Sequence, residues 1–221
     1  MYTRDIYNVV QKNMNEKAPS GTYNEQPGRV YWTKNNYYDN PKTKTVIQLT
    51  NGDEKGYQYS FNAVLTKKFD FGFTGSFGYT YTMAKDMTAN PGSSAASVWQ
   101  NNVAVNSLND PGVSYSLFST PHRLIANASY EVAYANMKTT VSLFYTGYQQ
   151  GRFSYTYSND MNGDGNYSDL MYVPASKEEM TFVDIKDKQN NVTYSAVDQQ
   201  EDFWNYVNND SYLNDHKGQY V

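Results

Sequence analysis

The segment from Phe69 to Ala84 alternates between two kinds of side chain along its whole length. Its odd-numbered positions are aromatic or apolar apart from Gly75, and its even-numbered positions are small or polar. Successive side chains of a β-strand point to opposite faces, and a strand rises about 3.3 Å per residue, so this run would span roughly 50 Å. Strands of soluble sheets typically have only about 5–6 residues. The segment therefore predicts one long strand with an aromatic face and a small, polar face.

The preceding segment carries the same alternation. Apolar residues share one face from Tyr57 to Leu65, and the phase extends back to Ile47 and Leu49. This pattern predicts one very long strand from Thr43 to Thr66, with a bulge near Gly52 or Gly56. Lys67-Lys68 would then form the turn of an antiparallel hairpin with the strand that starts at Phe69.

A second hairpin is predicted further along the chain. Apolar residues alternate from Leu124 to Tyr134, with Ile125 as an exception, and again from Met137 to Tyr145 after the dipeptide Ala135-Asn136. The same phase continues through Phe153 to Tyr157. With a ragged first strand from Ile6 to Lys12, the chain is expected to have about five long strands.

The connections between these strands are of two kinds. The hairpin turns are short, whereas residues 12–42, 85–120 and 158–221 form long loops, the last with a short helix predicted over Asp202–Asn208. Short turns at one end and long loops at the other are typical of outer-membrane barrels, which have aromatic-rich exteriors and polar interiors. We therefore predict an all-β fold, an antiparallel transmembrane β-barrel segment. Because such barrels need at least about eight strands, this barrel would be incomplete.

A soluble β-sandwich with its aromatic face inward is the alternative to the barrel. In that case the chain would be a secreted glycan-binding or adhesive module. Composition favours the barrel: 39% of the residues are hydrophobic, but this count includes 23 Tyr. Without Tyr and with Gly, the apolar fraction is about 35%, below the 45–50% of an ordinary soluble domain.

Composition also excludes several other classes of protein. The net charge is −4 and the 18 Lys and Arg are scattered, which excludes nucleic acid as a partner. No stretch approaches the ~18 apolar residues of a membrane helix. With two His, no Cys and no G-x-S-x-G motif, we predict no enzymatic activity and no catalytic residues.

Residues 160–169 contain the sharpest local motif. Asp160, Asn162 and Asp164 supply oxygens at positions 1, 3 and 5 of a calcium-type loop, and Gly165 follows at position 6. Calcium takes six to eight oxygen ligands, so a ligand from Asn166 and a closing carboxylate from Asp169 are expected as well. An Asx-rich turn without a metal is the alternative. The loop is thus a candidate Ca²⁺ site that would rigidify an external loop.

Several motifs occur in an order that resembles a known family. They are Thr120–Leu124, Gly151–Tyr157, Asp160–Gly165, Asp169–Pro174, Phe203-Trp204 and Asp210–Gly218. Together they resemble the C-terminal barrel portion of the TonB-dependent outer-membrane receptors, nearest to the Oar-like and SusC-like receptors of Bacteroidota. The resemblance covers most of the chain from Thr43 to Val221.

The resemblance implies a receptor or transporter of the bacterial outer membrane. Such proteins form a 22-stranded barrel with a plug domain inside, take energy from the TonB complex, and import a bulky nutrient such as a glycan or a peptide, often with a surface lipoprotein partner. The chain from 1 to 221 is then expected to be a partial barrel domain embedded in outer-membrane lipid. The plug domain and the N-terminal region that contacts TonB are expected to lie outside it.

Overall fold

The structure, a computed structural model, describes residues 1–33, 37–38, 45–90 and 92–221. Parts of the predicted loop 12–42 and the predicted strand start at Thr43 lie outside the described residues. Strands account for 40% of the chain and helices for 14%, and the sheets are antiparallel. The expectation of a mostly β, antiparallel fold is therefore confirmed.

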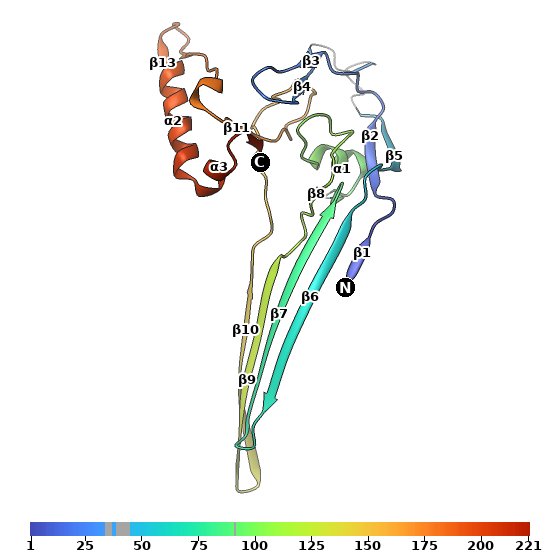
Figure 1. The fold of residues 1–221 in the computed structure, drawn as a ribbon, viewed down its shortest axis with the longest axis vertical. Coiled ribbons are helices and arrows are strands. Elements are labelled where there is room, and N and C mark those ends of the chain that lie inside the picture. Colours follow the sequence, from blue (N-terminus) through green and yellow to red (C-terminus); the bar gives the residue numbers. More distant parts are fainter. Residues whose placement is uncertain (34–36, 39–44, 91) are drawn as a thin grey trace. The chain divides into compact units, whose positions relative to one another are not determined.

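The elements are labelled in Figure 1. The strands are β1 (Tyr2–Arg4), β2 (Val9–Asn13), β3 (Gly21–Thr22), β4 (Val30–Tyr31), β5 (Ile47–Asn51), β6 (Tyr57–Lys68), β7 (Phe73–Asp86), β8 (Ser114–Tyr115), β9 (His122–Tyr134), β10 (Met137–Tyr148), β11 (Tyr172–Val173), β12 (Ile185–Lys186), β13 (Val192–Tyr194) and β14 (Gln219–Tyr220). The helices are α1 (Ala95–Asn101), the 3-10 turn η1 (Lys177–Glu179), α2 (Ala196–Asn209) and α3 (Ser211–Asp215).

One six-stranded sheet contains all the long strands of the described residues. Its order is β1-β6-β7-β9-β10, with β8 added to the end of β7. The strands β6, β7, β9 and β10 run side by side for 12 to 14 residues each (Figure 1). β1 covers the edge of β6 only at Tyr57–Tyr59, and no strand of the described residues pairs with the outer edge of β10. The sheet is open within the part of the chain that the structure describes.

The first hairpin differs from its prediction at the turn. β6 extends through Lys68, and the turn is formed by residues 69–72, so the predicted strand start at Phe69 and the predicted Lys67-Lys68 turn are wrong. Gly72 adopts a φ of 92°, a conformation that favours glycine. The rings of Phe69 and Phe71 gather with Phe73, at centroid distances of 5.3 to 6.1 Å. Because this aromatic cluster continues the alternation through the turn, the pattern did not show where β6 ends and β7 begins.

The predicted strand from Thr43 to Thr66 is interrupted. β5 and β6 belong to different sheets, and residues 52–56 between them are not a strand. Gly56 lies so close to the next strand that a Cβ there would be 2.8 Å from the Lys85 carbonyl oxygen. The predicted first strand, Ile6 to Lys12, corresponds to β2, which begins later, at Val9, while β1 lies before the predicted range. Gly52 and Gly56, where the prediction placed a bulge, thus mark the break between β5 and β6.

The second hairpin is confirmed residue by residue. β9 and β10 pair from Met137↔Tyr134 to Tyr148↔Arg123, so the two-residue turn is Ala135-Asn136 as predicted. The prediction that the strand phase continues through Phe153 to Tyr157 is wrong, because β10 ends at Tyr148 and only Thr156 forms an isolated bridge, with Leu170.

The loops predicted to be long fold into small elements of their own. α2 begins at the cap Ser195, whose hydroxyl oxygen accepts the Asp198 N–H at 3.1 Å. It contains the predicted helix 202–208 and buries Val207, four residues after the partly buried Phe203. Val207 belongs to a core cluster with Met171, Val173, Leu213 and Val221. A second cluster joins Trp99, Ala104 and Leu108.

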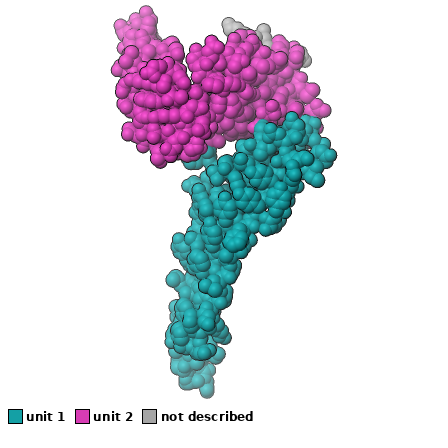
Figure 2. All heavy atoms as spheres, in the orientation of Figure 1, with its two compact units in different colours: residues 1–10, 50–89, 112–153 teal, residues 11–49, 90–111, 154–221 magenta. Residues whose placement is uncertain are grey.

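The chain forms two compact units, coloured in Figure 2. Unit 1 consists of residues 1–10, 50–89 and 112–153, and unit 2 of residues 11–49, 90–111 and 154–221. Among the described residues, the buried apolar side chains of unit 1 are Val10, Met87 and Pro121, whereas both core clusters lie in unit 2. Unit 1 therefore has long strands with almost no interior, while unit 2 has the buried core of an ordinary small domain.

Candidate functional site

The aromatic face of the unit 1 sheet is uncovered. The register places the odd-numbered side chains of β6, β7 and β10 on one face with the even-numbered side chains of β9. One row across the four strands is Leu65, Phe77, Ala126 and Tyr145. Leu65 is 73% exposed, Phe77 51% and Tyr145 59%. Because exposed apolar patches of this extent are rare on soluble monomers, the face is a candidate contact surface.

The opposite face of the same sheet is mainly polar. Its rows contain residues such as Ser60 with Thr82, Asn62 with Thr80, and Thr66 with Ser76 and Asn127. Val64, Ile125 and Phe144 are apolar exceptions on this face. The predicted division into an aromatic and a polar face is thus present on four adjacent strands.

The calcium-type loop lies in unit 2, and its side-chain oxygens accept hydrogen bonds from its own backbone N–H groups. Asp160 accepts the N–H of Gly163 through Oδ1 (2.7 Å) and the N–H of Gly165 through Oδ2 (2.9 Å). Both glycines have positive φ, 82° and 90°. Asn162 Oδ1 accepts the Asp164 N–H at 2.9 Å, and Asp164 Oδ1 accepts the Asn166 N–H at 2.8 Å. The loop is a chain of Asx turns.

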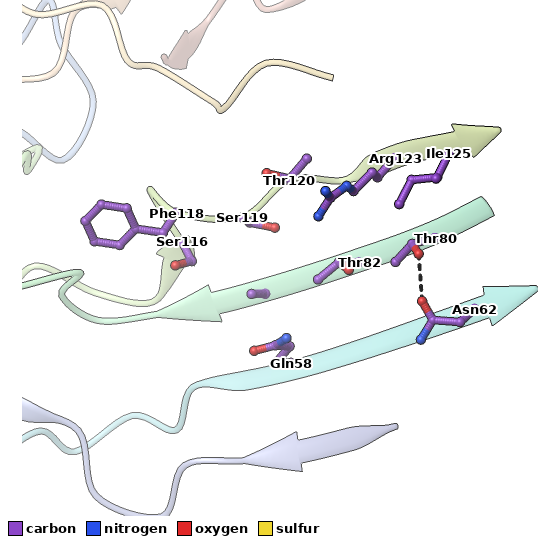
Figure 3. A pocket seen from close by; sticks show the side chains of 11 residues that line it. Gln58, Asn62, Thr80, Thr82, Ser116, Phe118, Ser119, Thr120, Arg123 and Ile125 are labelled. Atoms are coloured by element: carbon purple, nitrogen blue, oxygen red, sulfur yellow. Dashed lines mark hydrogen bonds between the residues drawn. The ribbon is translucent and has the colours of Figure 1, made fainter. Parts of the chain in front are cut away.

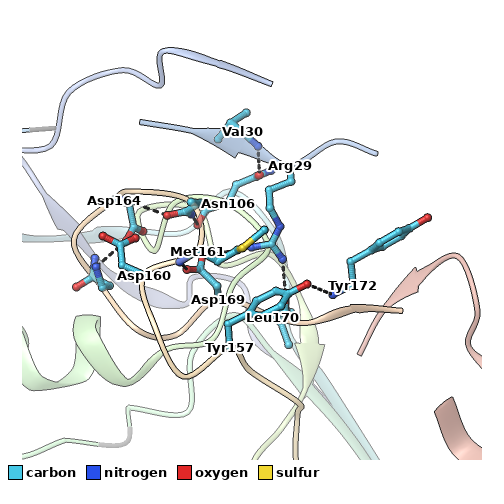
Figure 4. A network of polar contacts seen from close by, with 12 residues as sticks. Arg29, Val30, Asn106, Tyr157, Asp160, Met161, Asp164, Asp169, Leu170 and Tyr172 are labelled. Carbon is cyan, nitrogen blue, oxygen red and sulfur yellow. Dashed lines mark hydrogen bonds and ion pairs between the residues drawn. The ribbon is translucent and has the colours of Figure 1, made fainter. Parts of the chain in front are cut away.

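Arg29 is a partner of this loop that the sequence did not identify. Its side chain is fully buried and forms an ion pair with Asp169, Nη1 to Oδ1, at 3.4 Å (Figure 4). It also donates to the Leu170 carbonyl, and its guanidinium lies 5.0 Å from the Tyr220 ring centroid. Asp169 accepts the Met161 N–H at 2.9 Å as well. The sequence around Arg29 contains no motif that predicts these contacts. The pairing of Arg29 with the loop is therefore seen only in the folded chain.

Two carboxyl groups near the loop have raised pKa values. Burial, with the nearby carboxylates Asp169 and Asp160, raises the pKa of Asp164 to about 6. Burial and the charge of Asp164 raise the pKa of Glu16 to about 7, against a lowering by the Ser107 hydroxyl. That hydroxyl donates to Glu16 Oε2 at 2.8 Å, while Glu16 Oε1 is buried without a hydrogen-bond partner. Unit 2 thus buries more acidic charge than Arg29 neutralises.

The fit of the loop to a metal ion is partial. Within the described residues, no three side chains of the Asp, Glu and His types lie close enough to share a metal ion. Asp169 is already held by Arg29 and the Met161 N–H. Asn162, Asp164 and Asn166 are at most 7% exposed. Asp160, Asn162 and Asp164 also accept backbone N–H groups, but none of them is in one of the ion pairs of the described residues. They remain the candidate oxygen ligands, and calcium binding stays a prediction.

Side chains with catalytic potential make structural contacts. His122 is 2.7 Å from the Tyr79 hydroxyl through Nδ1. Glu179 accepts from the Tyr172 hydroxyl and the Ala175 N–H, and Glu201 forms an ion pair with Lys177. The absence of enzymatic activity stays a prediction.

Comparison of the chain with protein-family models, with curated proteins and with solved structures finds no match in any of the three. Among the described helices, none is both long and apolar enough to cross a membrane.

The raised pKa values predict how unit 2 responds to pH. Folded Glu16 keeps its proton up to about pH 7, whereas the unfolded chain releases it near 4.5. The stability that the proton provides is therefore complete below pH 4.5 and is lost as the pH rises through 7. We expect the free energy of unfolding to fall by on the order of 2 kcal/mol over this range. The fluorescence of the buried Trp32 and Trp99, both in unit 2, would report it.

Glu16→Gln is the control for this prediction. It keeps an oxygen that accepts from Ser107 but cannot ionise, so the fall in stability between about pH 6 and 7 should disappear. The fall that Asp164 causes at lower pH should remain. A variant with the same pH dependence as the parent would show that Glu16 is not the group responsible.

Proposed function

We propose that the chain is part of an outer-membrane receptor or transporter of the TonB-dependent type, a part of its barrel wall. The uncovered aromatic face of β6, β7, β9 and β10 carries this proposal. Four adjacent strands expose their apolar side chains, and unit 1 buries almost none. Lipid is the medium in which such a face is stable, and a closed barrel is the sheet that a bilayer tolerates.

Strand length and connectivity support the same proposal. The four strands have 12 to 14 residues, enough for the 9–11 residues of a transmembrane strand. The two hairpin turns at one end of the sheet are short, and the connections at the other end are long. In this proposal the aromatic face contacts lipid, the polar face lines the lumen, and the long connections are extracellular.

The free edges define what the rest of the barrel supplies. In hydrocarbon, each unpaired N–H or C=O costs several kcal/mol, so an open sheet edge is not stable there. Most of β6 and all of β10 lack an outer partner within the described residues. We propose that further strands of a larger receptor pair with these edges. That receptor would also hold the plug and the contact with TonB, and would import a bulky nutrient such as a glycan or peptide with a surface lipoprotein partner.

A self-contained β-sandwich has less support. It needs a second sheet large enough to cover the aromatic face. Besides the six-stranded sheet, the described residues form two-stranded sheets with strands of at most five residues. None of these sheets could cover a face four strands wide and 12 residues long.

A pair of variants on one strand tests the membrane proposal. Phe77→Arg charges the proposed lipid face near the middle of β7, and should cost about 2–4 kcal/mol of membrane stability. Ser76→Arg adds the same charge to the proposed lumen face and should be tolerated. Flotation of the chain with lipid vesicles after a urea wash measures both: the parent and Ser76→Arg should float, and Phe77→Arg should not. A parent chain that stays in the aqueous fraction as a folded monomer would refute the proposal.

We also propose that the 160–169 loop binds Ca²⁺ through Asp160, Asn162 and Asp164. Calcium would offset the repulsion and desolvation that raise the pKa of Asp164, so adding it should protect the loop from proteolysis and raise the unfolding temperature at neutral pH. Asp160→Ala and Asp164→Ala should abolish the response, whereas Asp187→Ala, in another loop, should keep it. An unchanged parent at millimolar calcium would remove the calcium proposal and leave the membrane proposal intact.

A further inference from the structure

The polar face of the unit 1 sheet contains an open hollow of about 480 Å³ (Figure 3). All of its lining residues belong to unit 1. They are Gln58, Asn62, Thr80, Thr82, Ala84, Ser116, Phe118, Ser119, Thr120, Arg123 and Ile125. The volume lies within the range of about 300–1,000 Å³ that is usual for small-molecule sites. The hollow is therefore large enough for a ligand of a few sugar or amino-acid units.

The sheet register places three polar side chains in one row of the hollow. Asn62 pairs with Thr80, and Thr80 pairs with Arg123. The Thr80 hydroxyl donates to Asn62 Oδ1 at 2.7 Å, drawn as the dashed line in Figure 3. Because the amide oxygen of Asn62 is used in this way, its NH₂ group is left to donate. Asn62 and Arg123 thus both offer N–H donors in the same row.

The hollow has one sign of charge. Arg123 is the single charged residue among the described lining residues, and none of them is acidic. The three ion pairs of the described chain do not include Arg123. Thr82, Thr120 and Ser119 contribute hydroxyl groups to the same lining. A planar guanidinium without a carboxylate partner, among neutral donors, suits a bidentate carboxylate.

We propose that this hollow binds the carboxylate of a polar solute, with Arg123 as the charge partner and Asn62 as a second donor. The proposal deepens the proposed function and rests on it for the assignment of this face to the lumen. Phe118, 72% exposed, gives the hollow an apolar wall against which the uncharged part of the ligand packs. The carboxylate could come from an acidic sugar or from the C-terminus of a peptide, and both present the same group to Arg123.

Four probes separate these sources. Tri-galacturonic acid and its methyl ester test an acidic sugar, and N-acetyl-trialanine and its C-terminal amide test a peptide. Binding is measured by calorimetry on the full chain, in nanodiscs or in buffer, whichever medium gives the folded strand spectrum. We expect one of the two acids to bind, its neutral counterpart to bind at least tenfold more weakly, and added salt to weaken the binding.

The variants test the two named donors. Arg123→Gln should weaken binding of that acid about tenfold or more, since charge-assisted hydrogen bonds are lost. Lys68→Gln removes a charge of the same sign from the same face outside the hollow, and should leave binding unchanged. If Arg123→Gln does not fold, Asn62→Asp is the second test of the site. This variant keeps the acceptor for Thr80 and places a negative charge against the ligand, so it should weaken binding of the acid.

Failure of this inference is distinguishable from failure of the proposed function. A folded chain that binds neither acid, binds acid and neutral probe equally, or binds unchanged in both variants overturns the carboxylate site. Insertion into vesicles without acid binding leaves the membrane proposal standing. Acid binding by a chain that folds only in buffer leaves the site standing and removes the membrane proposal.

Discussion

The contact between the aromatic face of the sheet and its surroundings is the interaction on which the account of this protein depends. Burying a Leu, Phe or Met side chain is worth about 1.5–3 kcal/mol. The face exposes residues such as Phe61, Leu65, Phe77, Val141 and Leu143 by half or more. Left in water, they would forfeit on the order of 10 kcal/mol, comparable with the entire 5–15 kcal/mol by which a typical protein is stable. The medium on this face therefore decides whether unit 1 folds at all.

Unit 2 differs from unit 1 because it buries apolar side chains in a core of its own. Its apolar side chains gather around Trp99 and around Val207, and side chains of the 160–169 loop accept hydrogen bonds from the backbone of the same loop. The buried Arg29–Asp169 pair ties the 160–169 loop to a segment more than a hundred residues earlier in the chain. Removing one member of such a pair leaves an uncompensated buried charge, which typically costs 3–5 kcal/mol. One chain thus combines strands that need a covering medium with loops that provide their own core.

The sequence was most informative where a single local rule decides the structure. Alternation with a period of two located both hairpins, and the turn at Ala135-Asn136 agrees to the residue, because a strand that slips by one position exposes the wrong face. The pattern misplaced the turn at Phe69 to Gly72, since the aromatic cluster there preserves the alternation after pairing has ended. It also joined β5 to β6, because a close backbone approach at Gly56 leaves no trace in the alternation. For the loop, the spacing of Asp160, Asn162 and Asp164 revealed a turn of oxygen ligands, but the contacts of Arg29 and Glu16 depend on long-range folding.

The most direct test is a spin-label scan of residues 73–82 in lipid vesicles, one introduced cysteine at a time, which the absence of native Cys makes clean. Collision with oxygen, which concentrates in hydrocarbon, and with a water-soluble nickel chelate reports the medium at each position. We expect oxygen access at the odd positions and nickel access at the even positions, alternating with a period of two. Odd positions shielded from both reagents would place protein against the aromatic face and contradict the account.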